Sequence, residues 1–207
     1  MRINTKRWLP SPGLNTRILL FVGIIVLATA AVATFLIKWT TRRLVEDAIG
    51  DADSVFLALW LDATRQVFGE DAGLLEDKVV IDPSNPIGFE NGQMIRTLPD
   101  GQSAGSVVAG LLPASAHYVK AFGTLAAGDL AKGANREPRR IVLFYATDDD
   151  RAASTAERLI HVAGFEPVKV GGAADAGRIE GPDGDLQGKV LDLDQAHAAL
   201  AAKEGSA

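Results

Sequence analysis

Three short stretches of this sequence place polar or aromatic side chains directly after predicted apolar strands. Leu59-Trp60-Leu61-Asp62 follows the first strand, Asp82-Pro83-Ser84-Asn85-Pro86 ends the second, and Lys120, Phe122 and Thr124 end the third. In open parallel sheets, ligands bind beyond the carboxyl ends of the strands. We therefore expect these three turns to form a ligand site.

The candidate ligand-binding residues are Trp60, Ser84, Asn85, Pro86, Lys120, Phe122 and Thr124. Ser84 and Asn85 supply hydrogen-bond donors and acceptors, although the same residues between two prolines commonly bond their own backbone in a turn. Lys120 would complement a phosphate or carboxylate, whereas Phe122 and Trp60 would pack on a planar ring or fill the end of the sheet. A ligand role and a structural role are therefore both open for this group.

Other reactive side chains form no recognisable catalytic set. The run Asp148-Asp149-Asp150 precedes a predicted helix, where carboxylates cap free amides and favour the helix dipole, so capping is preferred to a metal or acid-base role. His117, His161 and His197 lack a metal-ligand spacing, and the chain has no cysteine, which excludes disulfides and thiol nucleophiles. No Ser-His-Asp set or P-loop is found. We assign no metal, and the catalytic residues are unknown.

Alternating strands and helices would position these turns. Strands are predicted at Ser54–Leu59, Lys78–Asp82, Tyr118–Phe122, Arg140–Ala146 and Glu166–Val170. Helices are predicted at Ala63–Gly69, Gln102–Leu112, Ala126–Ala131, Arg151–Ala163 and Gln195–Lys203. In the glycine-rich tail, Arg178–Glu180 and Lys189–Leu191 are interpreted as short strands or loop edges. This alternation is typical of an α/β fold with right-handed crossovers and a mostly parallel sheet.

The twenty consecutive residues Ile18–Ile37 carry no charge and are bounded by Arg17 and Lys38. At about 1.5 Å per helical residue they would reach about 30 Å, the thickness of the hydrocarbon core of a bilayer. We therefore predict a single-pass transmembrane helix whose partner is the lipid bilayer. The alternative is a signal peptide cleaved at Ala31-Val32-Ala33, but the apolar run continues past that site.

The predicted organisation has four parts: a basic tail at 1–17, the transmembrane helix at 18–37, a juxtamembrane helix at 38–50 and an α/β domain at 51–207. The net charge is −5. A mildly acidic domain argues against nucleic acid as a partner. The N-terminal side of the apolar run carries one more basic residue than the C-terminal side. Because cytoplasmic flanks carry the excess of basic residues, this count slightly opposes a cytoplasmic location for the α/β domain.

Taken in order, the three turns resemble those of the NADP-dependent coenzyme F-420 reductase-like family, Rossmann-fold oxidoreductases related to pyrroline-carboxylate reductases. The similarity extends over about residues 46–200 and includes Asp51–Trp60, Lys78–Pro86, Leu98–Leu125, Phe144–Asp150 and Ala163–Val168. The resemblance implies a truncated Rossmann-like sheet that binds NADP(H) and a deazaflavin, coenzyme F-420, or a flavin. It further implies hydride transfer between these cofactors, and a cytoplasmic site where NADPH is supplied.

Members of that family open with a strand and a Gly-x-Gly-x-x-Gly turn, which holds the cofactor pyrophosphate at a helix N-terminus. This sequence has no such turn, so the nucleotide-binding half would have to be supplied in trans. In the strand order 3-2-1-4-5-6, Ser54–Leu59 corresponds to the fourth strand, and its neighbour is missing. An open apolar edge attracts another chain, so we expect a partner chain or a second copy there. The alternative is a non-catalytic binding or assembly module with a degenerate Rossmann domain.

Overall fold

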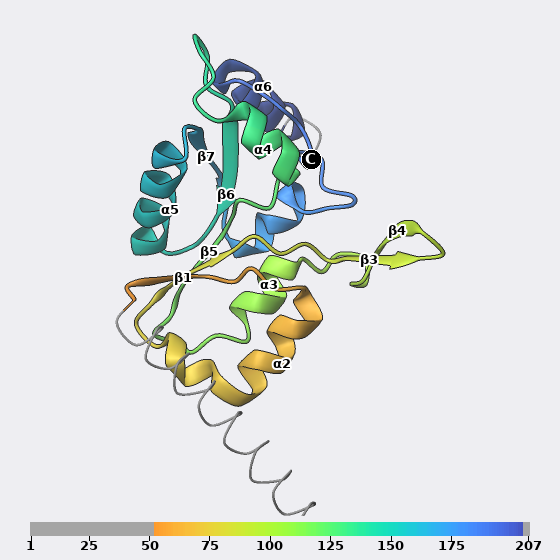
Figure 1. The fold of residues 1–207 in the computed structure, drawn as a ribbon, viewed down its shortest axis with the longest axis vertical. Coiled ribbons are helices and arrows are strands. Elements are labelled where there is room, and N and C mark those ends of the chain that lie inside the picture. The colour runs from red at the N-terminus through yellow and green to blue at the C-terminus, as the bar shows by residue number, and fades with distance from the viewer. Residues whose placement is uncertain (1–51, 205–207) are drawn as a thin grey trace, which may run out of the picture. The chain divides into compact units, whose positions relative to one another are not determined.

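The computed structural model describes residues 52–204. The predictions for residues 1–17, 18–37 and 38–50 fall outside this range. The first half contains β1 (Ser54–Phe56), α2 (Leu61–Asp71), the 3-10 helix η1 (Ala72–Leu75), β2 (Val79–Asp82), β3 (Ile87–Glu90), β4 (Gln93–Arg96) and α3 (Ala104–Ala109). The second half contains β5 (His117–Ala121), α4 (Ala127–Gly133), β6 (Val142–Ala146), α5 (Asp150–Val162), β7 (Glu166–Gly171), the 3-10 helix η2 (Ala173–Ile179) and α6 (Leu193–Glu204) (Figure 1).

Five strands form one sheet in the order β1-β2-β5-β6-β7. The pairs β1-β2, β2-β5 and β6-β7 are parallel, which confirms a mostly parallel α/β sheet. β5 and β6 are antiparallel and pair through two residue pairs, Lys120 with Ala146 and Ala121 with Tyr145. This antiparallel pair is the exception within the predicted mostly parallel sheet. Because β1, β2 and β5 run in the same direction, their carboxyl ends lie at the same end of the sheet, and the predicted turns follow them there.

Apolar side chains of the sheet alternate between two faces, because successive side chains of a strand point in opposite directions. Val79 and Ile81 of β2 join the core that α4 and α5 cover. Val80 joins a second core with α2 and α3 on the opposite face. A third core packs β6 and β7 against η2 and α6. The sheet is thus covered by helices on both faces, as expected for this fold class.

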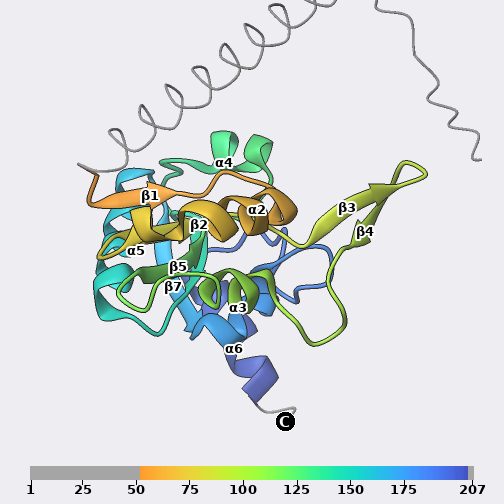
Figure 2. The same ribbon diagram turned by 90° about the horizontal axis from the view of Figure 1, so that it is seen from below.

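An antiparallel hairpin formed by β3 and β4 is separate from the main sheet and projects away from it (Figures 1 and 2). Its turn contains Asn91 at φ 51° and Gly92 at φ 79°, the left-handed conformations that a tight two-residue hairpin turn requires. Phe89 pairs directly with Met94 across the hairpin, so the two side chains lie on the same face. This hairpin is absent from the sequence-based expectations.

Two further predictions differ from the structure. An apolar strand is predicted over Ser54–Leu59, but β1 ends at Phe56. Phe56 is 49% exposed, because β1 lies at the edge of the described sheet. Arg178–Glu180 is not a strand, since η2 extends to Ile179. Lys189–Leu191 is a loop edge, where the Leu191 carbonyl accepts a hydrogen bond from the Val142 N–H at 2.8 Å.

The membrane localisation predicted from the sequence is corrected. Within residues 52–204, no helix combines the length and the apolar character needed to cross a bilayer. The segment that carried the prediction, Ile18–Ile37, lies outside the described residues.

Candidate functional site

A cleft of about 380 Å³ lies where β1 and β2 end and the β3–β4 hairpin begins. Its aromatic residues, Trp60 and Phe89, are each 65% exposed, and Met94 is 53% exposed. None of the nine described residues that line it is charged. We call it the strand-end cleft. Its exposed aromatic side chains and uncharged lining suit a flat, uncharged part of a ligand.

The structure brings together some of the predicted site residues and not others. The lining of the cleft includes Trp60, Ser84 and Asn85 from the predicted set, together with Ile87, Phe89 and Met94 from the hairpin. It does not include Pro86, Lys120, Phe122 or Thr124. The hairpin residues were missed because the hairpin itself was not predicted, although the Asn91-Gly92 dipeptide is a hairpin signal that could have revealed it.

The turn after β2 is held by its own polar side chains. Asp82 Oδ1 accepts a hydrogen bond from the Ser84 N–H at 2.8 Å. Asn85 Nδ2 donates to the Gly123 carbonyl at 2.9 Å, and Asn85 Oδ1 accepts from the Gly181 N–H at 2.9 Å. The turn chemistry considered for this segment is therefore present. The Asn85 amide is already bonded on both sides, whereas the Ser84 hydroxyl accepts from Lys120 Nζ at 3.5 Å and has its own hydrogen to donate to a ligand.

Lys120 lies in a buried charged network below this turn and is fully enclosed. Its Nζ is 3.1 Å from Asp82 Oδ2 and 3.5 Å from Glu180 Oε1, and it also donates to the Ser84 carbonyl. The Tyr118 hydroxyl donates to Asp82 Oδ2 at 2.8 Å. Burial, with the Asp82 carboxylate beside it, raises the pKa of Tyr118 well above its ordinary value. The Lys120 side chain is thus paired with the carboxylates of Asp82 and Glu180 and does not line the cleft.

Glu180 is a buried acidic residue that the sequence did not single out. Its two carboxylate oxygens accept hydrogen bonds from the Ala104 and Gly105 N–H groups at 2.7 Å each, at the start of α3. A Cβ on Gly105 would lie 2.5 Å from the Cβ of Ala176, so glycine is needed where α3 packs against η2. These partners are more than seventy residues apart in the chain, and no local pattern marks their contact.

The loop after β5 is held in an unusual conformation. Phe122 has φ 65°, a left-handed conformation that is rare for a bulky residue. Its ring makes an edge contact with Phe56 at 5.4 Å between centroids. A Cβ on Gly123 would lie 2.5 Å from the Pro83 carbonyl oxygen. Thr124 is 1% exposed, and its hydroxyl has no hydrogen-bond partner within the described part of the chain.

Pro86 is buried, and its backbone joins the turn to the hairpin. The Pro86 carbonyl accepts a hydrogen bond from the Thr97 N–H at 2.8 Å, and the Asn85 carbonyl accepts from the Ile87 N–H at 2.8 Å. At the end of β4, Arg96 Nη1 lies 3.7 Å from Asp183 Oδ2. These contacts fix the base of the hairpin beside the cleft.

The three consecutive aspartates lie at the start of α5, away from the cleft. Asp149 Oδ1 accepts from the Ala152 N–H at 2.7 Å, which confirms the capping interpretation. Asp149 Oδ2 is 2.7 Å from His117 Nδ1, and Arg151 approaches the other ring nitrogen at 3.2 Å. Partial burial raises the pKa of the Asp149 carboxyl, but hydrogen bonds from His117 and from Ala152 outweigh it and the net pKa is lowered.

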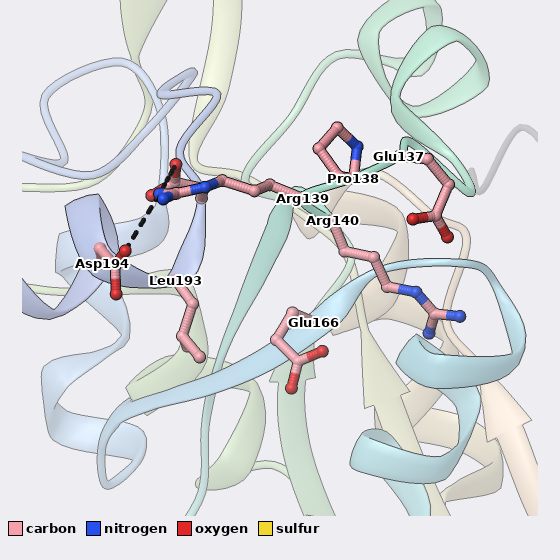
Figure 3. A pocket seen from close by; sticks show the side chains of 8 residues that line it. Glu137, Pro138, Arg139, Arg140, Glu166, Leu193 and Asp194 are labelled. Carbon is pink, nitrogen blue, oxygen red and sulfur yellow. Dashed lines mark hydrogen bonds and ion pairs between the residues drawn. The ribbon is translucent and has the colours of Figure 1, made fainter.

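A second pocket, of about 340 Å³, lies at the amino ends of β6 and β7 (Figure 3). Its lining includes Glu137, Arg140 and Glu166. Arg139 Nη1 lies 3.0 Å from Asp192 Oδ2 and 3.0 Å from Asp194 Oδ2, and Figure 3 shows Arg139 beside Asp194. Exposed ion pairs of this kind are screened by water and add little stability. Because Arg139 of this pocket is already paired with two carboxylates, and because the predicted site residues Trp60, Ser84 and Asn85 line the strand-end cleft, we place the candidate site in that cleft.

The fold and the cleft define a Rossmann-like α/β protein with an uncharged cleft, the candidate site, at the ends of its parallel strands. The chain belongs to the same family as the hypothetical protein SMa0349 of Sinorhizobium meliloti. The two are 30% identical over 72% of this chain and 70% of that one, with a TM-score of 0.60.

A second similar structure comes from Arthrobacter sp. FB24 and is provisionally described as an F420-dependent NADP-reductase. It is 20% identical over 63% of this chain and 60% of that one, with a TM-score of 0.56. This likeness supports the predicted resemblance at the level of an NADP oxidoreductase-like fold. No protein-family model matches the chain, and no curated protein does.

Proposed function

We propose that this chain binds the planar ring of NADP(H), or of a deazaflavin, in the strand-end cleft, and that its reaction is hydride transfer between two such rings. The observation that carries the proposal is the pair of exposed aromatic side chains, Trp60 and Phe89, on an uncharged cleft at the strand ends. The choice of cofactor comes from the description of the Arthrobacter protein. Hydride transfer is the chemistry these cofactors supply, and it needs no protein nucleophile.

The residues present fit the ring portion of such a cofactor. The volume of about 380 Å³ falls in the range of about 300–1,000 Å³ found for small-molecule sites. Trp60 and Phe89 offer ring faces, and Ser84 offers a hydroxyl to a polar ring substituent. The described lining contains no lysine or arginine, so the cofactor phosphates would be bound by groups outside the cleft.

Ligand titration of the purified full-length protein tests this proposal. NADPH, and separately oxidised coenzyme F-420, would be added while the fluorescence of each ligand is followed. We expect saturable binding that Trp60→Ala or Phe89→Ala weakens by about 2- to 10-fold, since an aromatic pair contributes about 0.5–1.5 kcal/mol. Val162→Ala is the matched control, because this α5 side chain is 79% exposed and lies outside the cleft lining. Absence of binding, or equal affinity in all variants, would contradict the proposal.

A second candidate is a non-catalytic binding or assembly module. It is favoured by one observation, the lack of a Gly-x-Gly-x-x-Gly turn anywhere in the sequence, since that turn binds the pyrophosphate in dinucleotide-binding folds. With both ligands at saturation, the first candidate predicts that NADPH is oxidised and that F-420 is reduced by the hydride it transfers. Ring binding without any such turnover would support the second candidate.

A further inference from the structure

The two edges of the described sheet differ in their protection against pairing with another strand. β7 contains Pro167 and Lys169, and its pairing with β6 is interrupted by a register shift at Tyr145 and Ala146. Proline, lysine and bulges are devices that prevent edge-to-edge association. β1 is Ser-Val-Phe and has none of these three devices, so its only protection is its length of three residues. Within residues 52–204, the less protected pairing edge is therefore β1.

The backbone of β1 presents hydrogen-bonding groups to this open edge. The Asp53 carbonyl accepts from the Val79 N–H at 3.0 Å, and the Leu57 N–H donates to the Ile81 carbonyl at 2.9 Å, so residues 53 and 57 face β2. Because backbone groups alternate along a strand, Val55 also faces β2. Ser54 and Phe56 then direct their N–H and C=O groups to the open edge.

We propose that the β1 edges of two copies of this chain pair in antiparallel orientation about a two-fold axis. Pairing of β1 with β7 of another copy would build an open fibre, and the protected β7 edge opposes it. Antiparallel pairing of two identical edges closes into a two-fold symmetric dimer. This inference is independent of the proposed ligand.

Charge and hydrogen bonding select the register of this pair. The outward groups of Ser54 bond to those of the partner subunit's Phe56, which centres the two-fold axis on Val55. Asp53 then lies opposite the partner subunit's Leu57, so no like charges face each other. A parallel pair in register would place Asp53 beside the partner subunit's Asp53, a destabilising contact. In the antiparallel pair, the side chain of the partner subunit's Ser54 lies beside the exposed ring of Phe56.

Disulfide trapping tests this register directly, because the chain has no cysteine of its own. Val55 would face the same residue of the other copy as a non-hydrogen-bonded pair, with Cα atoms about 4.5 Å apart, within the range of about 4.4–6.8 Å that a disulfide spans. We expect full-length Val55→Cys to form a covalent dimer on mild oxidation and to revert with a reductant. Asp53→Cys is the control, since it faces residue 57 and should remain uncrosslinked.

Sedimentation of the unmodified full-length chain and of two proline variants completes the test. Ser54→Pro removes an N–H that faces the open edge, so it should give a folded monomer. Val55→Pro removes an N–H that faces β2, so it should unfold the protein. A wild-type chain that stays monomeric at all soluble concentrations would overturn the proposal. A dimer that resists Ser54→Pro, or that gives no crosslink with Val55→Cys, would overturn it equally.

Discussion

Lys120, Asp82 and Glu180 form a buried charged group that touches the strand-end cleft through Ser84. A buried ion pair adds little net stability, but removal of one partner leaves an uncompensated charge and costs about 3–5 kcal/mol. The group therefore positions the turn after β2, the start of α3 and the tail around Glu180 relative to one another. A lysine that a sequence pattern suggests as a phosphate ligand serves in this chain as an internal counter-ion.

Both tyrosines of the chain provide a pH-dependent test of this interior. Burial raises the pKa of Tyr118, with Asp82 adding to the shift, and burial raises the pKa of Tyr145, with its hydrogen bond to Glu157 adding to the shift. Folded protein should therefore show no tyrosinate absorbance at 295 nm near pH 10, whereas protein in denaturant should ionise with a pKa of about 10. A tyrosinate step near pH 10 in the folded protein would refute this burial.

The sign of the stability effect follows from the same shift. Above about pH 10 the unfolded chain loses tyrosine protons that the folded chain retains, so the free energy of unfolding falls as the pH rises. The stability that this pKa shift provides is fully present below the tyrosine pKa of the unfolded chain. It is lost as the pH rises to the tyrosine pKa of the folded chain. Tyr118→Phe should reduce this slope in urea unfolding experiments between pH 9 and pH 11, while an unchanged slope would count against the assignment.

Elements with a strong local pattern could be predicted from the sequence. Strands β2, β5, β6 and β7 and helix α5 lie within two residues of their predicted bounds, because continuous apolar runs and helical spacing mark them. The direction of β6 could not be predicted, since a strand buried on both faces has the same pattern in either direction. Glu180 and the hairpin wall of the cleft depend on contacts distant in sequence, apart from the Asn91-Gly92 signal.

The hairpin gives a prediction at the scale of one element. Gly92 has φ 79°, and an L-residue in the left-handed region costs about 1–2 kcal/mol. Gly92→Ala should therefore lower the hydrogen-exchange protection of the β3 and β4 amides by about 5- to 30-fold and weaken ring binding, because Phe89 and Met94 line the cleft. The free energy of global unfolding should fall by no more than this cost of about 1–2 kcal/mol, because the strain is confined to one turn.

Gly128→Ala is the matched control for this variant. Gly128 lies in α4, and a Cβ there would also meet no atom within 4 Å, but its φ is not positive. This substitution should leave the exchange of the hairpin amides unchanged. Equal protection in Gly92→Ala and in the wild type would show that the turn does not need its left-handed glycine.

At the scale of the whole molecule, the two proposals use different parts of the sheet. The ring-binding proposal concerns the uncharged cleft at the strand ends, and the dimer proposal concerns β1, the edge strand of the sheet within residues 52–204. Rossmann-like folds host many reactions, so the fold alone does not define the chemistry. The central claim of a ring-binding cleft therefore depends on the residues of the cleft and needs a test that distinguishes the parts of the ligand.

Saturation-transfer difference NMR of NADPH with the purified full-length protein is the most direct such test, because it reports which ligand protons contact the protein. The account predicts the strongest transfer to the nicotinamide protons and the weakest to the adenine protons, with the nicotinamide signal reduced in Phe89→Ala. Transfer dominated by the adenine protons, or no transfer at all, would contradict it.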